Sequence, residues 1–348
     1  MAIKKGFFFT FFVITALSLV VLTYKIGVEY KEADRAEVIK KRVEQTNKFV
    51  EDIDSDMDKA LFISAFRSML AMDEYIKLKN DFIRPPVEGV PDEALSRLVV
   101  NGTVREENSA ESSKQKFRNM ETMDGSTIAQ WIGNVNELAK PYKVRVSFPD
   151  SIDVRAVMIS PWEVNFSLET DVSVMMLDND VFWNFSVSKF VIVSIVGFPD
   201  PFYHVGSIKN YADNSGTNEG DVKPLLNTIR VSPYDFSFAQ TTITPFFGHA
   251  TGQYYYSSQL NAPDYFSRLR GDYDAEDNFG IESFVNVSAS NAIFSYSSAG
   301  TSTCATDYQF FGSSCSDADK ENLNGMSSRF YIDGDGVDYY NLHAFVSP

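Results

Sequence analysis

The chain has 348 residues, with 47 Asp and Glu against 31 Lys and Arg, which gives a formal net charge of −16. A chain this acidic lacks the basic face that nucleic-acid binding requires, so nucleic acid is excluded as a partner. Its two cysteines exclude a disulfide-dense scaffold, and 44% hydrophobic residues exclude wholesale disorder. An acidic globular protein of about two domains remains.

An uncharged, apolar stretch lies close to the N-terminus. It runs from Phe7 to Thr23, between Lys5 and Lys25. A membrane-spanning helix needs roughly 17–25 such residues, and no small-residue cleavage site follows that would favour a secretory signal peptide. We therefore expect residues 1–25 to be a cytoplasmic tail and a transmembrane helix. Because long domains translocate largely regardless of flanking charge, we expect a membrane-anchored protein with an extracellular C-terminal body.

A long stalk or spine helix is predicted over residues 26–84. No proline occurs in this range, and Pro85 and Pro86 end it. A break near Gly27 or at residues 54–56 is equally compatible. Apolar or small residues recur at heptad steps of three and four, at Ala36, Ile39, Val43, Thr46, Val50, Ile53, Met57 and Ala60. The apolar pattern then broadens, which predicts burial in a head domain, through Leu61, Phe62, Ile63, Phe66, Met69, Leu70 and Met72. An ordinary domain helix beside an anchor is the alternative.

The first residues resemble a known signal sequence. Lys4, Lys5 and Gly6 precede Phe7 in the manner of the class III signal peptide of archaeal type IV pilin-like proteins. The resemblance implies that a membrane peptidase cuts between Gly6 and Phe7, and that the apolar stretch packs in a filament core. It also implies a head in which a sheet is laid on a helical spine. A plain signal-anchored protein is the alternative.

Residues 85–198 are predicted to combine helices with an antiparallel sheet. Two short helices and an intervening polar loop are indicated at residues 91–100, 126–140 and 101–125. Apolar and polar residues then alternate, as in strands with one wet face, at residues 144–148, 163–169 and 182–196. The stretch Phe190 to Val193 is apolar on both faces, which indicates a central strand. We expect an α+β fold, with a three- to four-stranded antiparallel sheet packed on the long helix.

Residues 199–348 are expected to form a second, aromatic, loop-rich β part of the head. A helical turn is indicated at Pro263 to Leu269. Tyrosines cluster at residues 254–256 and 339–340. Exposed tyrosine beside Asp or Asn is typical of surfaces that contact carbohydrate or protein, while a role in core or strands is the alternative.

Cysteines and sequons supply candidate modification sites. Cys304 and Cys315 are separated by ten residues in a Ser/Gly-rich loop. In an oxidising exterior a disulfide closing this loop would contribute about 2–4 kcal/mol to stability. Two free thiols, or metal ligands, are the alternatives. Four N-x-S/T sequons mark candidate glycosylation sites at Asn101, Asn165, Asn184 and Asn286.

One acidic run suggests calcium, the only cofactor that we consider. Asp333, Asp335 and Asp338 alternate with glycines near the C-terminus, and hard oxygen ligands at alternate positions are what Ca²⁺ prefers. A second run covers residues 272–277. Neither run fits the EF-hand loop. The first has Val337 where an oxygen ligand should be, and the second has Asp277 in place of the obligatory glycine and Ser283 in place of the terminal glutamate. A solvated acidic turn is the alternative for both.

No catalytic motif is present. The three histidines, His204, His249 and His343, share no ligand spacing, and no H-E-x-x-H, G-x-S-x-G or P-loop pattern occurs. We therefore expect a non-enzymatic minor or tip subunit of a cell-surface filament or adhesion apparatus. A monomeric signal-anchored extracellular receptor or glycan-binding protein is the alternative, and an exported hydrolase with a deep carboxylate-lined pocket is the third. Expected partners are the lipid bilayer, filament subunits contacted through the N-terminal helix, and a cell-surface protein or glycan.

Overall fold

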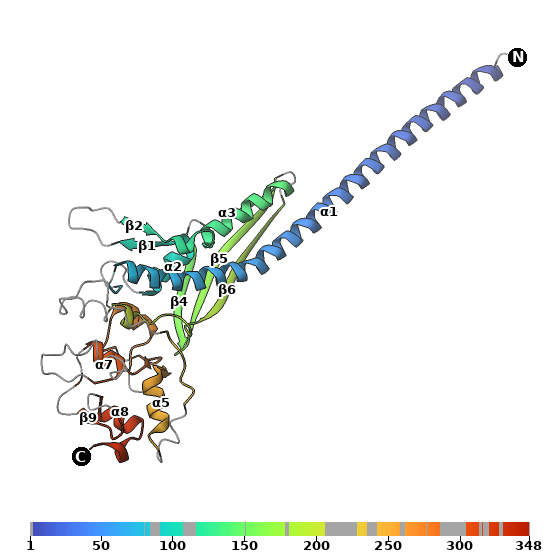
Figure 1. Cartoon of the computed structure of the whole chain (residues 1–348). Helices are drawn as coiled ribbons and strands as arrows, with labels where there is room; N and C mark the ends of the chain where they lie inside the picture. Colours follow the sequence, from blue (N-terminus) through green and yellow to red (C-terminus); the bar gives the residue numbers. More distant parts are fainter. Residues whose placement is uncertain are drawn as a thin grey trace.

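The computed structural model has one long helix and a head built around the C-terminal half of that helix (Figure 1). It describes residues 3–79, 81–83, 91–106, 116–149, 151–177, 181–205, 228–234, 242–257, 262–275, 277–285, 304–312, 315, 320–326 and 330–347. Side chains of residues 3–12, 26–36, 106 and 116 lie outside this description.

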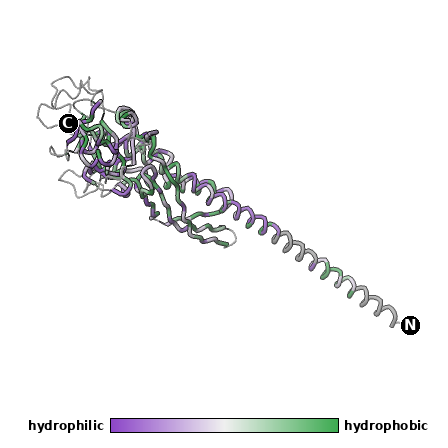
Figure 2. The backbone as a smooth tube through the Cα atoms, turned by 90° about the horizontal axis from the view of Figure 1, so that it is seen from below, coloured by the Kyte–Doolittle hydropathy of each residue, from purple (hydrophilic) through white to green (hydrophobic). Residues whose placement is uncertain are grey.

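The first helix, α1 (Ile3–Lys79), runs for 77 residues without a break. At ~1.5 Å of rise per residue its length is about 115 Å. Neither Gly27 nor residues 54–56 interrupt it. Figures 1 and 2 show its N-terminal half leaving the head as a single rod, with the N-terminus at the far end. Ion pairs one turn apart, such as Lys41 with Glu37 at 2.9 Å, support the helix where it carries charge.

The prediction of a membrane-spanning segment is contradicted. Within the described part of the chain, no helix combines the length and the apolar character that crossing a bilayer requires. The expected transmembrane helix, and the membrane-anchored location inferred from it, are therefore wrong for the chain as the structure describes it.

A four-stranded antiparallel sheet forms the platform of the head. Its strands are β3 (Val144–Ser147), β4 (Asp153–Ser160), β5 (Glu163–Met176) and β6 (Phe182–Ser194). The long strand β5 is central, because β6 pairs along one side of it while β3 and β4 share the other. The α+β class and the antiparallel sheet follow from the alternation in the sequence, and both are present.

The central position predicted for residues 190–193 is wrong. Among the described residues β6 pairs with β5 alone and so forms an edge of the sheet. Phe190 is 69% exposed and Ile192 is 45% exposed on its outer face, while Val193 is buried on the inner face. The outer apolar face of β6 is therefore exposed to solvent. Apolar residues on both faces of a strand do not by themselves show that the strand is central.

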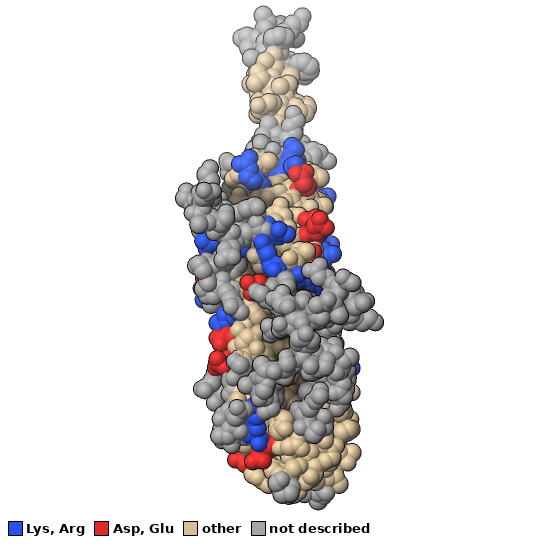
Figure 3. Space-filling model, turned by 60° about the vertical axis from the view of Figure 1, so that its left-hand side comes forward, with Lys and Arg blue, Asp and Glu red and all other residues tan. Residues whose placement is uncertain are grey.

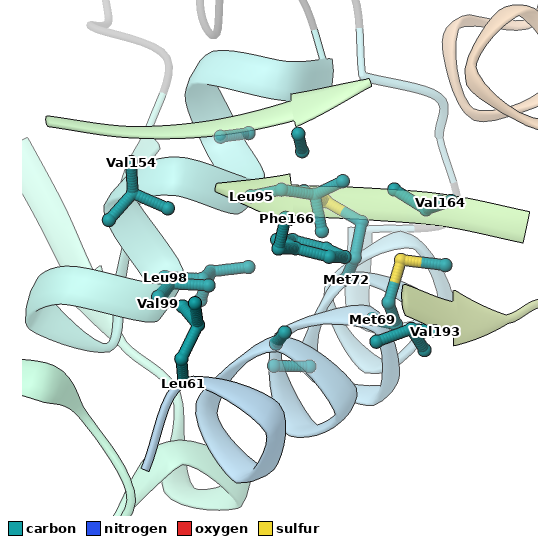
Figure 4. Packing of buried hydrophobic residues seen from close by; sticks show 14 of the residues in the cluster. Leu61, Met69, Met72, Leu95, Leu98, Val99, Val154, Val164, Phe166 and Val193 are labelled. Carbon is teal, nitrogen blue, oxygen red and sulfur yellow. The ribbon is translucent and has the colours of Figure 1, made fainter. Parts of the chain in front are cut away.

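Three helices cover the inner face of the sheet: α1, α2 (Pro91–Asn101) and α3 (Ile128–Ala139). A capping box starts α3, in which the side chain of Thr127 accepts from the backbone of Gln130. Figure 4 shows side chains of α1 and α2 meeting those of the sheet in one core, which includes Leu61, Met69, Met72, Leu95, Leu98, Val99, Val154, Val164, Phe166 and Val193.

The predicted polar loop at residues 101–125 is partly a hairpin. Strands β1 (Thr103–Glu106) and β2 (Lys116–Asn119) pair antiparallel, and the turn η1 (Glu121–Met123) follows them. A second turn, η2 (Lys140–Tyr142), links α3 to β3. The hairpin was missed because each strand has only four residues and one of them reads KFRN, with a single apolar side chain.

The C-terminal part is built from short elements: α5 (Thr244–Gly252), β7 (Tyr256–Ser257), α6 (Tyr265–Arg270), β8 (Ile281–Glu282), α7 (Asp307–Gly312), β9 (Lys320–Asn322), β10 (Tyr331–Asp333), α8 (Gly334–Tyr339) and η5 (His343–Phe345). Some of them, with neighbouring residues, join the large core, through Tyr265 on α6 and through Tyr203 and Tyr255 outside the named elements. Others enclose a second core around Phe246 and Phe284.

The buried face of α1 predicts a large difference between two leucines of the same helix. Leu61 is fully buried under the sheet, whereas Leu78 is 59% exposed. Leu61→Ala should cost about 2–5 kcal/mol, because it removes buried methyl groups and leaves a cavity. Leu78→Ala should change stability by less than about 0.5 kcal/mol. Urea unfolding of both variants measures this, and equal losses would contradict the packing.

Candidate interaction site

The projecting segment of α1, residues 13–25, exposes apolar side chains on every side. On the face that Figure 3 shows, the segment appears as an uncharged band, and Figure 2 shows most of it hydrophobic; its last residue, Lys25, is charged. Successive helical residues are rotated by about 100°, so a continuous run of apolar residues leaves no polar face. Seven of its aliphatic residues are 41–67% exposed: Val13, Ile14, Leu17, Leu19, Val20, Val21 and Leu22.

Two hydroxyl groups in the projecting segment are turned back onto the helix. Ser18 Oγ donates to the carbonyl of Ile14 at 2.8 Å, and Thr23 Oγ1 donates to the carbonyl of Leu19 at 2.9 Å. These bonds satisfy the hydroxyl protons within the helix. Up to Thr23, before the exposed Tyr24 and Lys25, the segment therefore offers a neighbouring molecule a largely apolar surface.

A second apolar surface lies on α1 inside the head. The outer stripe, as we name it, consists of Phe62, Ile63, Phe66 and Leu70, which are 48%, 50%, 40% and 37% exposed. The ring of Phe66 contacts Phe198 edge-on, with centroids 5.3 Å apart. The sequence predicted burial for these residues together with Leu61 and Met69, but the sheet covers only one side of the helix. Clustered exposed apolar residues of this kind mark contact surfaces.

Polar contacts hold α1 on the head where the rod begins. Trp183 Nε1 on β6 donates to Asn47 Oδ1 at 2.9 Å. On the same strand, Lys189 Nζ lies 3.0 Å from Asp54 and 3.2 Å from Asp58. Burial alone would lower the pKa of Lys189, but its bonds to the two carboxylates outweigh that effect and raise it. These contacts fix the direction in which α1 leaves the sheet.

A buried ionic cluster joins the C-terminal part to the sheet. Arg268 on α6 is fully buried, and its Nη1 lies 2.7 Å from Asp200, which follows β6, and 2.9 Å from Asp307 on α7. Its guanidinium lies over the ring of Phe202, 4.7 Å from the centroid. Tyr255 Oη donates to Asp200 at 2.7 Å. No motif in the sequence indicates this cluster, because its members are far apart in the chain.

Burial and charge have opposite effects on the pKa values of the cluster. Burial alone would lower the pKa of Arg268, but the charges of Asp200 and Asp307 outweigh it and raise that pKa. Burial raises the pKa of Asp307 as well, against the opposing effect of Arg268. Two carboxylates share one cation in a site without water access, so the groups hold each other in place. None of these residues is among those that line the described surface hollows.

The predicted calcium candidates serve the local fold. Asp333 is the N-cap of α8, where its Oδ1 accepts from the backbone of Gly336 at 2.8 Å. Asp338 lies 2.9 Å from His343, and Asp335 is exposed. Searching the described ranges finds no group of three or more His, Cys, Asp and Glu placed to hold a metal ion. In the second run, Asp277 accepts from Ser267 Oγ at 2.6 Å and so braces α6.

The predicted modification sites are placed as follows. Cys304 and Cys315 form a disulfide, with Cα atoms 5.7 Å apart, which confirms their pairing. Asn101 is exposed at the end of α2, and Asn165 on β5 and Asn184 on β6 lie on the outer face of the sheet. Three further positions cannot be placed: Asn286 lies outside the described residues, and Gly6 and Phe7 belong to the backbone of α1 without described side chains.

The tyrosine clusters are not flat contact surfaces. Tyr255 and Tyr340 are fully or almost fully buried, and Tyr254, Tyr256 and Tyr339 are half-buried. Tyr340 belongs to the second core, where its hydroxyl donates to Glu282. The alternative reading of these residues as core is therefore the correct one for Tyr255 and Tyr340.

The histidines occupy three separate environments. His204 Nδ1 lies 2.8 Å from Asp73 on α1, which also pairs with Lys77 at 2.7 Å. Burial alone would raise the pKa of Asp73, but these two partners outweigh it and lower that pKa. His249 is buried in the second core, and His343 is exposed.

Comparisons with family models, with curated proteins and with solved structures found no match for this chain.

The buried cluster predicts a strong effect of removing its cation. Arg268→Met leaves two carboxylates buried without their partner and should destabilise the protein by about 3–5 kcal/mol. The matched control is Arg270→Met on the same helix, where the side chain is 31% exposed and bonds Ser267 at 2.8 Å. It should cost about 1 kcal/mol. Urea unfolding compares the two, and similar losses would refute the role of Arg268.

A pH dependence follows from His249, which packs against Phe284, Tyr256 and Tyr340. Burial lowers its pKa from 6.5 to about 3. Between these values the unfolded chain binds a proton that the folded chain does not. Stability should therefore fall as the pH drops below 6.5, by at most about 1.4 kcal/mol per pH unit from this group.

The variant His249→Phe keeps an aromatic ring but removes the proton, so its stability should fall less steeply between pH 6.5 and pH 4. The control is His343→Phe, because the side chain of His343 is 65% exposed. Urea unfolding at several pH values gives the slopes. Equal slopes for the wild type and His249→Phe would argue against a neutral buried His249.

Proposed function

We propose that this chain is a non-enzymatic subunit of a filament built from its own copies, held together by the projecting segment of α1. The observation that carries the proposal is the exposure of apolar side chains on all sides of residues 13–25. A helix that is apolar all round is stable when other groups surround it. Parallel copies of the same segment supply such surroundings.

The energy available from this contact is large. Burying one exposed aliphatic side chain contributes about 1.5–3 kcal/mol. The free energy gained by burying seven such residues in each copy therefore exceeds a substantial free-energy cost of association. The outer stripe around Phe62 and Phe66 provides a second apolar surface, closer to the head, for a neighbouring helix.

The arrangement of helix and sheet in this chain is consistent with such an assembly. A long helix carries a sheet on its C-terminal half and leaves its N-terminal half bare, as in the pilin-like subunits that Lys4 to Phe7 resemble. The polar contacts of Asn47, Asp54 and Asp58 with β6 keep the head on one side of the rod.

The test is the mass of the full-length protein in solution and its appearance in electron micrographs. The wild type should assemble, whereas the double variant Leu17→Glu, Val21→Glu should remain a monomer of 39.1 kDa. Glutamate is a good helix former, so the variant should keep its helix content by circular dichroism. A charged side chain in the packed segment cannot be paired, which is why assembly should fail.

The control is Lys48→Glu, which makes the same change in net charge on an exposed position of α1. It should assemble like the wild type. A monomeric wild type, or a double variant that assembles equally well, would reject the proposal. The intact mass of the natural protein tests processing separately: a chain that begins at Phe7 supports pilin-type cleavage, and one that begins at Met1 refutes cleavage but not assembly.

A further inference from the structure

Two hollows follow the same strand of the sheet. One, of about 620 Å³, lies beside residues 151–155 and the helix α2. The other, of about 440 Å³, lies beside residues 156–158 and the helix α6. Asp92, at the start of α2, lines both. Together they form a depression beside β4, which we name the β4 groove.

The groove lies along the edge of β4 and not on one of its faces. Neighbouring residues of a strand point to opposite faces, so a hollow lined by several consecutive residues runs along the backbone. Asp153, Val154 and Arg155 line the first hollow, and the next three residues of β4 line the second. The groove is therefore bordered by the main chain of β4.

Among the described residues, the backbone of β4 is paired on one side only. Its register with β5 runs from Asp153, opposite Glu169, to Ser160, opposite Glu163. In the part of the chain that the structure describes, no strand pairs with the other side of β4. N–H and C=O groups along an edge of this kind are a template for a further strand.

The dimensions of the groove suit an extended peptide. It follows eight residues, from Ser151 to Met158, and at ~3.3 Å per residue this is about 26 Å. The helices α2 and α6 border it. The first hollow is bordered by Ser96 and Arg97, and the second by Phe266 and Phe279. A bound strand would therefore meet a polar half and an apolar half.

The charge of the groove selects a basic occupant. Five acidic residues line it, against three arginines: Asp92, Glu93, Asp153, Asp264 and Asp277, with Arg97, Arg155 and Arg270. Three of these carboxylates have partners within the protein: Asp153 is bonded to Arg155 at 2.7 Å, and Asp264 and Asp277 accept hydrogen bonds from Ser267 at 2.8 Å and 2.6 Å. The attraction for a basic peptide therefore rests on Asp92 and Glu93. Asp92 and Glu93 lie on the first turn of α2, where the two hollows meet. Lysine or arginine side chains of a bound strand would approach these carboxylates.

We infer that the β4 groove binds an extended, basic peptide segment of another protein, which adds to the sheet as a strand beside β4. Backbone hydrogen bonds to the edge of β4 supply affinity, and alternate side chains of the peptide enter the two hollows. A basic side chain lies near Asp92 and Glu93, and an apolar one near Phe266 and Phe279. This activity is separate from assembly through α1.

The experiment uses a synthetic peptide of eight residues in which lysine and valine alternate, with phenylalanine at one end and a fluorescent label. Its binding to the full-length protein is followed by anisotropy. An otherwise identical peptide with glutamate in place of lysine should bind at least about tenfold more weakly, because the groove is acidic. Measuring in the Leu17→Glu, Val21→Glu variant as well separates this result from the outcome for assembly.

Two N-methylated peptides test the backbone contact directly. Alternate residues are methylated in one peptide, and the remaining residues in the other. Only one edge of a bound strand faces β4, so one methylated peptide should lose binding while the other keeps it. If both bind like the parent peptide, strand addition is refuted.

Protein variants then locate the site. Asp92→Asn with Glu93→Gln should weaken binding of the lysine peptide about tenfold and reduce its salt dependence. Glu51→Gln with Asp52→Asn, an equal change on the exposed surface of α1, should leave binding unchanged. No binding of the lysine peptide, equal binding of the glutamate peptide, or loss of binding as the protein associates with itself would overturn the proposal. The last result would assign the groove to a second copy.

Discussion

The structure depends on the burial of one side of α1 under the sheet. Leu61, Met69 and Met72 pack against Phe166 and Val164 in a core from which water is excluded. This contact holds the C-terminal half of the helix in the head, and it gives the sheet the covered face that an amphipathic sheet requires. The opposite side of the same turns keeps Phe62 and Phe66 in contact with solvent, so a single helix serves both the interior of the head and its surface.

The C-terminal part is attached to this core by charge as well as by apolar contact. Arg268 draws together Asp200, which follows the sheet, and Asp307, which begins a distant helix. Such a buried arrangement gains little net free energy over a well-packed apolar one, but it tolerates few alternative geometries. The cluster therefore contributes more to selecting one arrangement of the C-terminal part than to the net free energy of folding. It sets where α6 lies, and α6 in turn borders the groove beside β4.

Periodic features of the sequence were predictable, and features that depend on distant residues were not. The heptad stripe through Ile53 and Met57 correctly indicated the side of α1 that is buried, and alternation from Val164 to Leu168 correctly indicated a half-buried strand. Periodicity could not reveal whether a second apolar face has a cover, which is why Phe190 was misplaced. Local composition could not distinguish a helix cap from a cation ligand at Asp333. No pattern in the sequence links Arg268 with Asp200 and Asp307.

The rod formed by the first half of α1 also acts as a lever. Between Ile3 and Asn47, where Trp183 bonds the helix, α1 has about 45 residues, or about 65 Å at ~1.5 Å per residue. A tilt of the helix by about 5° relative to the sheet at Asn47 would therefore displace its N-terminal end by about 6 Å, more than one helical turn. Trp183 and Lys189 bond α1 at the point where such a tilt would occur. A small change in these bonds would therefore produce a larger displacement at the N-terminal end of the helix. A structural change in the sheet would thus reach the N-terminal end of the molecule as a change in the angle between the head and the rod.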